Sequence, residues 1–197
     1  MNETDLWRCD GKVRCPKNFM GRFISKRVLD YHDLIWCKPC FDDRELFAML
    51  VLEIMQAGLS WGMVLEKEFA IREAFDFFDV DLVSRYGNKK IESMLNNANL
   101  VRNSRKIKAA INNARAFLEV QQRFCGFSNY IWSFTSGKVI DHRLTDLCDM
   151  LSENELSRKI SSDLKGRGFV FVGPVIIYSY LQAIGVFNDH HVNCEFR

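Results

Sequence analysis

EIMQAGLSW, residues 53–61, is the most informative stretch of the chain, because it puts a carboxylate inside an apolar helical pattern and an aromatic eight residues later. The residues of that pattern share one helical face at spacings of four, three and four: Leu46, Leu50, Glu53 and Ala57. Burying a carboxylate there costs on the order of several kcal/mol unless something pairs with it. Glu53 therefore meets a buried donor, lines a pocket where a ligand is its partner, or lies at the edge of the stripe beside an arginine.

The composition is that of a packed globular protein, either one domain over residues 1–197 or two small helical lobes that share a core. Hydrophobic residues make up 48% of the 197 and aromatic residues 13%, with 16 Phe, enough for a thick core. The net charge of +2 is too small to name a partner. Residues 11–29 hold six Lys and Arg and no acid, so this basic insertion either contacts phosphates or is a solvated loop.

The cysteines and the apolar segments bear on the compartment. Seven Cys behind a polar, charged N-terminus, without a signal peptide, predict a cytoplasmic protein whose thiols are free, metal-bound or catalytic. Residues 168–187 carry no charge and have the length of a membrane span. Gly173-Pro174 interrupts them, however, and polar side chains such as Gln182 lie in their middle. We therefore predict a buried core helix over 174–184 and no membrane association.

Helical periodicity dominates the chain. Helices are predicted over 44–57, 61–77, 80–86, 89–97, 104–122, 154–165 and 174–184, with a short aromatic segment at 127–134 and mainly loop at 135–150. The clearest apolar stripe, in the 104–122 helix, consists of Ile107, Ala110, Ile111, Ala114, Phe117 and Leu118. The predicted fold class is all-α, a helical bundle with a cleft if there are two lobes.

The two ends of the chain carry a candidate metal site. Cys9 and His32 lie near the start, and His190 and Cys194 lie four residues apart near the end. Two Cys and two His suit a tetrahedral structural zinc, which would tie the termini together. Other residues that could replace one of these ligands are Cys15, Cys37, Cys40 and His191.

A second motif, Trp36-Cys37-Lys38-Pro39-Cys40, has the spacing of a redox pair. Redox chemistry of this kind needs a cysteine of low pKa at a helix start within a βαβ unit. No parallel sheet is predicted here, so a zinc ligand or a plain surface thiol is the favoured interpretation.

The predicted helices 89–97 and 104–122 form a hairpin suited to a DNA phosphate. Asn103-Ser104 supplies good N-caps, and free N–H groups at a helix start make an anion site when cations flank them. The nearby cations are Arg102, Arg105, Lys106 and Lys108. Asn99 stands where DNA-binding hairpins usually have a glycine, and Asn tolerates positive φ. The alternative is an ordinary helical hairpin with a polar face.

Blocks of sequence from about Cys9 to Cys194 resemble the 3-methyladenine DNA glycosylase I family of bacterial alkylation-repair enzymes. In order they are Arg8-Cys9, Tyr31-His32-Asp33, Trp36, Leu46-Phe47, Leu52-Glu53, Gln56-Ala57-Gly58-Leu59-Ser60-Trp61, Lys106-Ile107, Asn113-Ala114-Arg115-Ala116, Trp132-Ser133-Phe134, Arg167-Gly168-Phe169, Phe171-Val172-Gly173 and Asn188-Asp189-His190. The block at 56–61 is specific to the family.

The resemblance implies an all-α fold of the helix–hairpin–helix glycosylase superfamily. It implies one structural zinc held by Cys9, His32, His190 and Cys194. It places Glu53 as the pocket carboxylate that recognises the methylated base, and the aromatic residues around it as Tyr31, Trp36 and Trp61. Gly58 and Leu59 fall where the family inserts into the gap left by the flipped nucleotide.

The activity implied is hydrolysis of the N-glycosidic bond of 3-methyladenine in double-stranded DNA by a monomer, which leaves an abasic site. Because the methylated base is cationic in DNA, its bond is already weak, and the enzyme must mainly extrude the base, hold it and exclude the normal one. No lyase step is expected, since no Lys near the pocket motifs is identifiable as a Schiff-base nucleophile.

Two other functions stay open at the level of the sequence. One is a zinc-stapled DNA-binding protein of the same fold without turnover. It is motivated by Gly11 and Val28, which stand where the family has aromatic residues, and by Asn99 in the hairpin. The other is a thiol oxidoreductase that uses Cys37 and Cys40.

Overall fold

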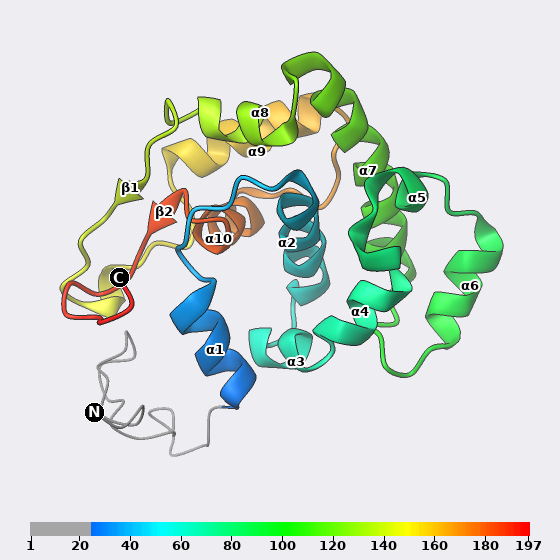
Figure 1. Ribbon diagram of the computed structural model, residues 1–197, viewed down its shortest axis with the longest axis horizontal. Helices are drawn as coiled ribbons and strands as arrows, with labels where there is room; N and C mark the ends of the chain where they lie inside the picture. The colour runs from blue at the N-terminus through cyan, green and yellow to red at the C-terminus, as the bar shows by residue number, and fades with distance from the viewer. Residues whose placement is uncertain (1–24) are drawn as a thin grey trace.

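The computed structural model describes residues 25–197, and these residues are mostly helical (Figure 1). The elements are α1 (Lys26–Leu34), α2 (Asp43–Gln56), α3 (Trp61–Glu66), α4 (Glu68–Ala74), η2 (Asp76–Phe78), α5 (Val80–Ser84), α6 (Asn88–Asn96), α7 (Ser104–Phe124), α8 (Phe127–Ser133), β1 (Ile140–Asp141), η3 (Leu147–Asp149), α9 (Glu155–Gly166), α10 (Pro174–Ala183) and β2 (Phe187–Asn188). Cys9, Gly11, Cys15 and residues 11–24 of the basic insertion lie outside the described residues.

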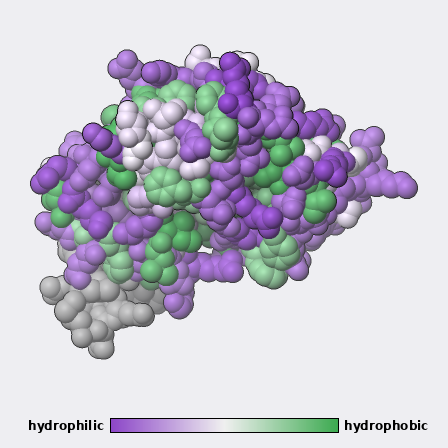
Figure 2. All heavy atoms as spheres, turned by 45° about the horizontal axis from the view of Figure 1, so that its top comes forward, coloured by the Kyte–Doolittle hydropathy of each residue, from purple (hydrophilic) through white to green (hydrophobic). Residues whose placement is uncertain are grey.

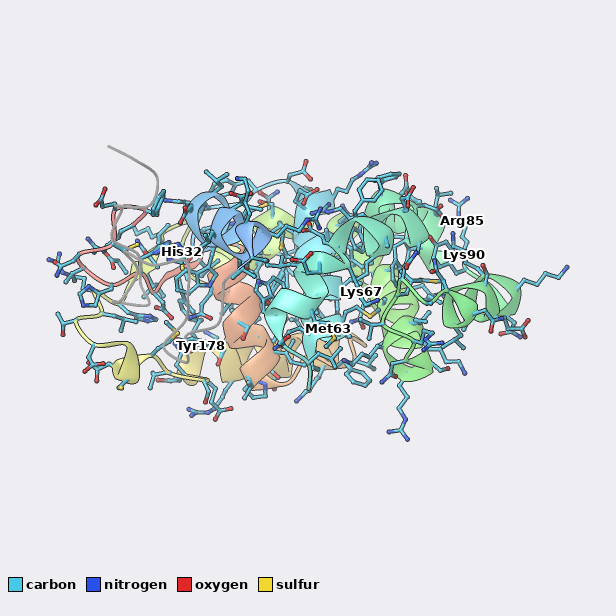
Figure 3. All side chains as sticks on the ribbon, turned by 90° about the horizontal axis from the view of Figure 1, so that it is seen from below. His32, Met63, Lys67, Arg85, Lys90 and Tyr178 are labelled. Atoms are coloured by element: carbon cyan, nitrogen blue, oxygen red, sulfur yellow. The ribbon has the colours of Figure 1, made fainter. Side chains whose placement is uncertain are left out.

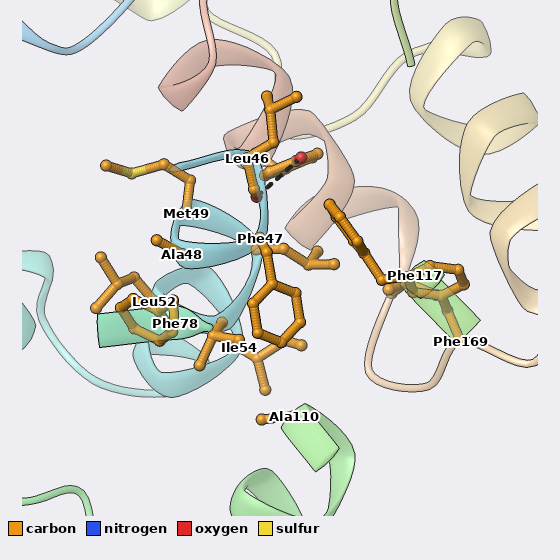
Figure 4. Close-up of a cluster of buried hydrophobic side chains, with 14 of the residues drawn as sticks. Leu46, Phe47, Ala48, Met49, Leu52, Ile54, Phe78, Ala110, Phe117 and Phe169 are labelled. Carbon is orange, nitrogen blue, oxygen red and sulfur yellow. Dashed lines mark hydrogen bonds between the residues drawn. The ribbon is translucent and has the colours of Figure 1, made fainter. Parts of the chain in front are cut away.

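The helix α2 runs through the centre of the molecule. From Leu46 to Met55 no residue is more than 5% exposed, so α2 is buried on every side rather than along the single stripe predicted. Its neighbours include α7, α8 and α10. Phe47 packs edge-on against Phe78 and Phe117, at ring distances of 6.2 and 5.3 Å, in the core shown in Figure 4. A helix that is apolar all round is expected at such a position.

Two parts of the predicted helix pattern are wrong. The segment before the Trp36 motif is a helix, α1, which was not predicted. Residues 61–77 are not one helix, because the chain breaks at Lys67 and again at η2, where Phe77 has a φ of 51°. No Gly or Pro marks the second break. Phe75 and Phe78 stack at 5.7 Å in the core, and burying both rings requires the chain to turn between them.

The C-terminal segment returns to the side of the molecule that carries α1 (Figure 1). β1 and β2 pair in parallel over two residues each, with Ile140 opposite Phe187, and β1 lies inside the region predicted as mainly loop. None of the helices in residues 25–197 is long and apolar enough to cross a membrane. Hydrophilic side chains cover much of the face in Figure 2, and hydrophobic ones lie between them in separate groups.

Asp43, at the start of α2, ties three helices together. Its Oδ2 accepts hydrogen bonds from Gln121 Nε2 at 2.7 Å and from the Phe127 N–H at 2.8 Å, and its Oδ1 accepts from the Ser128 N–H at 2.7 Å. The carboxylate therefore caps α8 from another element, which helix periodicity alone does not reveal.

We expect Asp43→Ala to lower the free energy of unfolding by about 2 kcal/mol, because it leaves the first N–H groups of α8 without a charged acceptor. Urea denaturation followed by circular dichroism measures the change. Asp81→Ala is the control, since Asp81 pairs with Arg85 on the surface and should change stability by less than about 0.5 kcal/mol. Equal losses in the two variants would contradict the role given to Asp43.

Candidate functional site

A pocket of about 150 Å³ opens where α1, α2, α3 and α10 meet. Its lining residues are Tyr31, Trp36, Glu53, Gln56, Trp61, Ser179 and Gln182. The four pocket residues named from the sequence thus lie together in the structure. The roles implied for them remain predictions, because a shared wall does not by itself show what the pocket binds.

Glu53 lies in the last turn of α2 and is 5% exposed. Its carboxylate makes no hydrogen bond or ion pair with any residue of 25–197, so of the three alternatives the structure shows the pocket wall rather than a buried donor or an arginine at the edge. Burial raises the pKa of Glu53 from 4.5 to about 8. A carboxyl that is expensive to ionise, and that lacks a partner in the protein, is ready to pair with a cationic ligand.

Aromatic rings form much of the remaining wall. Tyr31 and Trp61 meet edge to face at 5.0 Å and 61°. Burial, and then the nearby Glu53 carboxylate, raise the pKa of the Tyr31 phenol, which keeps it neutral. The Trp61 Nε1–H is buried and has no acceptor among the described residues, so it remains available as a donor.

Three polar lining residues were not predicted: Gln56, Ser179 and Gln182. Ser179 and Gln182 stand three residues apart on α10 and therefore lie on one face of that helix. Two polar side chains on one face of the charge-free 168–187 segment are the sequence feature that could have indicated a polar pocket wall. Gln182 Nε2 donates to the buried Asp189 Oδ2 at 2.7 Å, and the Tyr178 hydroxyl donates to the same oxygen at 2.7 Å. His142 binds the other Asp189 oxygen. This network fixes the Gln182 amide and leaves its Oε1 as an acceptor.

Beside the pocket, three of the four predicted metal ligands lie together. The ligand atoms of His32, His190 and Cys194 fall within 4.8 Å of one another, and His32 Nε2 lies 3.9 Å from Cys194 Sγ. Asp33 Oδ1, 2.8 Å from His32 Nδ1, holds the ring so that Nε2 faces the thiol. Two imidazoles and a thiol are the donor set that zinc prefers, so the residues present fit that metal. Cys9, the fourth predicted ligand, lies outside the described residues.

The His/Cys cluster also touches the pocket wall. Trp36 stacks on His32 at 5.7 Å and meets His190 edge-on at 4.7 Å, and its carbonyl lies 3.2 Å from His190 Nε2. Figure 3 labels His32 on α1 and Tyr178 on α10, which lie in the same half of the molecule. The His/Cys cluster therefore packs directly against Trp36, a residue of the pocket wall.

The alternative ligands among the described residues are used elsewhere. His191 Nε2 faces the Thr145 carbonyl at 2.8 Å, and His191 Nδ1 accepts from the Asn193 N–H. Burial raises the pKa of both Cys37 and Cys40, the opposite of what a redox pair needs. The N–H groups of Cys37 and Cys40 instead donate to carbonyls at the end of α10. The Cys37-to-Cys40 motif thus packs a turn against α10, and the oxidoreductase interpretation finds no support.

The predicted hairpin exists as α6, a connection over 97–103, and α7, but its details correct three expectations. Asn99 does not adopt positive φ. Asn103 Oδ1 accepts from the N–H groups of Arg105 at 3.0 Å and Lys106 at 3.3 Å, so these two donors are not free for an anion. Arg102 and Arg105 are exposed, as phosphate contacts require, whereas Lys106 is 5% exposed and turns inward.

The loop after α2 lies between two parts of the pocket wall. Gly58 is exposed and has a φ of 76°, a left-handed conformation that favours glycine, and Leu59 is half-buried. The Leu59 N–H donates to the Gln56 carbonyl at 2.6 Å, and Gln56 Nε2 donates to the Leu59 carbonyl at 2.9 Å. Gln56 thus closes the loop that carries the two residues predicted to enter DNA.

The raised pKa of Glu53 predicts how stability depends on pH. Between about 4.5 and 8 the folded protein binds more protons than the unfolded chain, so the free energy of unfolding should fall as pH rises through this window. Glu53→Gln has no such group, and its stability relative to the parent should rise by on the order of 4 kcal/mol between pH 5 and pH 9. Parallel urea titrations measure the difference. A difference that does not change with pH would show that Glu53 is not buried in this way.

Comparison with known proteins gives a consistent result. A family model described as methyladenine glycosylase matches residues 23–197. DNA-3-methyladenine glycosylase of Haemophilus influenzae is 39% identical over 185 residues, 94% of this chain and 98% of that protein. DNA-3-methyladenine glycosylase 1 of Escherichia coli is 40% identical over 164 residues, 83% of this chain and 88% of that protein.

Solved structures of the same kind are similar over most of the chain. The 3-methyladenine DNA glycosylase I of Staphylococcus aureus matches with a TM-score of 0.85 at 34% identity, covering 88% of this chain and 92% of that one. A tyrosine-to-phenylalanine variant of a 3-methyladenine DNA glycosylase I, in complex with 3-methyladenine, matches with a TM-score of 0.86 at 33% identity, covering 88% and 93%.

Proposed function

This chain belongs to the methyladenine glycosylase family, and from that premise we propose that it removes 3-methyladenine from double-stranded DNA by hydrolysing the N-glycosidic bond. The observation that carries the proposal is Glu53, a buried carboxyl without a partner among the described residues, in a pocket lined by aromatic rings. Such a site favours a flat cation over a flat neutral molecule, and a purine methylated at N3 in DNA is a flat cation.

Charge provides the selectivity. Because burial raises the pKa of Glu53 to about 8, the carboxyl is mostly protonated at neutral pH when no charge faces it. A cationic base lowers that pKa and pairs with the ionised form, whereas normal adenine offers no compensating charge. The faces of aromatic rings such as Tyr31 and Trp61 add cation–π attraction, up to about 2 kcal/mol each when desolvated. An extruded normal base would gain neither contribution.

The chemical step then needs little from the protein. A water oxygen bonds to C1′ of the sugar, the bond from C1′ to the base nitrogen breaks, and its electron pair stays with the base. The base leaves neutral, and the water loses a proton to solvent. We propose no lyase step, since Lys106, the lysine that contacts the loop after α2, commits its ammonium to two backbone carbonyls.

DNA binding follows from the surface around the pocket. Exposed Arg102 and Arg105 at the start of α7 would contact phosphates, as in a helix–hairpin–helix, and give affinity without sequence preference. Gly58 and Leu59 would fill the space left by the flipped nucleotide. The protein would act as a single-domain monomer.

We also propose that one structural zinc ties the chain ends together through Cys9, His32, His190 and Cys194. The support is the convergence of the last three residues, from α1 and the C-terminal segment, with donors of the right type. A zinc bound there supplies a cross-link and takes no part in the reaction. The zinc would affect the pocket by holding His32 and His190 in place, because the ring of the pocket residue Trp36 packs on both histidines.

The direct test is to incubate the protein with duplex DNA treated with a methylating agent and to separate the released bases by chromatography. We expect free 3-methyladenine and abasic sites in strands that stay intact until treated with alkali. Strand breaks without alkali would contradict the monofunctional mechanism. Binding to the methylated duplex without base release would favour the zinc-stapled DNA-binding protein without turnover.

A further inference from the structure

Lys106 is predicted from the sequence among the phosphate-binding cations of the hairpin, but in the structure it is buried. Its side chain is buried in the first turn of α7, and its Nζ donates to the Met55 carbonyl at 2.9 Å and to the Ala57 carbonyl at 2.6 Å. These bonds bridge 51 and 49 residues of sequence. Taking an ammonium out of water is costly, and here two carbonyls at the negative end of the α2 dipole compensate for it.

The two carbonyls belong to the base of the loop that follows α2. Gln56 closes the loop on itself, through its own carbonyl and through its side chain, but neither bond holds the loop to the rest of the protein. Lys106 makes that connection. Its bonds hold the chain just after Glu53 and just before Gly58, so they bear on the pocket wall and on the exposed tip together.

The other end of Lys106 lies among the cations of the hairpin. Asn103 caps the start of α7 by accepting from the N–H of Lys106 itself and from that of Arg105. Arg102 and Arg105 are exposed on either side of the cap. One side chain therefore joins the surface suited to phosphates to the loop at the pocket.

We propose that Lys106 is a positioning residue, which sets the loop 57–59 relative to the start of α7 so that a duplex bound at Arg102 and Arg105 meets the loop in line with the pocket. The inference rests on the proposed function, because it concerns how the same pocket reaches a base in DNA. It differs from a plain helix cap, which would stabilise α2 without affecting how a duplex is engaged.

Lys106→Met tests the proposal, since it keeps most of the side chain and removes the donors. We expect excision of 3-methyladenine from duplex DNA, measured in single turnovers, to fall by about 10- to 100-fold, as misplacement of a bound substrate does in other enzymes. Binding of free 3-methyladenine, followed by the fluorescence of Trp36 and Trp61, should stay within about twofold, because the free base needs no alignment with a duplex. Lys106→Arg should recover part of the duplex activity.

Arg115→Met is the matched control. Arg115 also lies on α7 and donates from Nε to a backbone carbonyl, that of Ser84 at 2.9 Å, but on the surface and away from the pocket loop. Its duplex activity should stay within about twofold of the parent, as surface substitutions usually do. If Lys106→Met lost free-base binding and duplex excision equally, Lys106 would only stabilise the end of α2 and the positioning role would be wrong. Unchanged excision would also overturn the proposal.

Hydrogen exchange separates this inference from the proposed function. In Lys106→Met the amides of residues 57–59 should exchange faster than in the parent, while those in the middle of α2 should not. If the parent released no base at all, the proposed function would fail. Exchange and free-base binding would then still decide whether Lys106 holds the loop, and unchanged exchange at 57–59 would refute it.

Discussion

Glu53→Gln should slow the release of 3-methyladenine from methylated duplex DNA by about 100-fold or more. Glutamine has nearly the same shape and keeps a hydrogen-bonding oxygen, so the change removes charge rather than packing. In the parent, the ionised carboxylate pairs with the cationic base in a pocket with little water, where such a pair contributes about 3 kcal/mol. The loss should appear in single-turnover release, measured by chromatography of the free base.

Two comparisons make this result specific. Glu66→Gln, an exposed substitution on α3 near the same pocket, should leave release unchanged within about twofold. Glu53→Gln itself should fold, and it should be more stable than the parent at high pH. If it is well folded and still releases base at one third of the parent rate or faster, the carboxylate charge is not what selects the substrate.

The second large effect concerns the His/Cys cluster. We expect the isolated protein to contain about one zinc per chain, and Cys194→Ala to lose most of it. Removing the metal should lower the free energy of unfolding by on the order of 5 kcal/mol, because a structural zinc is bound in the folded state and hardly at all in the unfolded chain. Elemental analysis and urea denaturation, with and without a chelator, measure both quantities.

His191→Ala is the control for the metal cluster. His191 is next to a predicted ligand, yet its ring nitrogens face Thr145 and Asn193, so this variant should keep its zinc. Loss of the metal should also weaken binding of the free base, because Trp36 packs on His32 and His190. If the parent protein contained no zinc, or if a chelator did not change its free energy of unfolding, the proposed structural zinc site would be refuted.

Local patterns were enough to predict most helices and the residues around one pocket. The spacing in α7 and the cap at Asn103 are local signals, and that helix begins close to where these signals place it. Glu53 stands out because an acid in an apolar helix requires an explanation. The pairing of His190 with Cys194 is likewise readable from a separation of four residues.

Most of the helices, the exceptional carboxyl and the His190–Cys194 pair can therefore be predicted from local sequence, since each depends on neighbours within a few turns of chain. The remaining features depend on contacts between distant parts of the chain. The tertiary structure broke the chain after Phe75 because two rings had to be buried together, and it directed Gln182 by placing Asp189 beside it. It also turned Lys106 from the surface toward carbonyls about fifty residues away. The energies of these choices come from partners distant in sequence, which no local pattern contains.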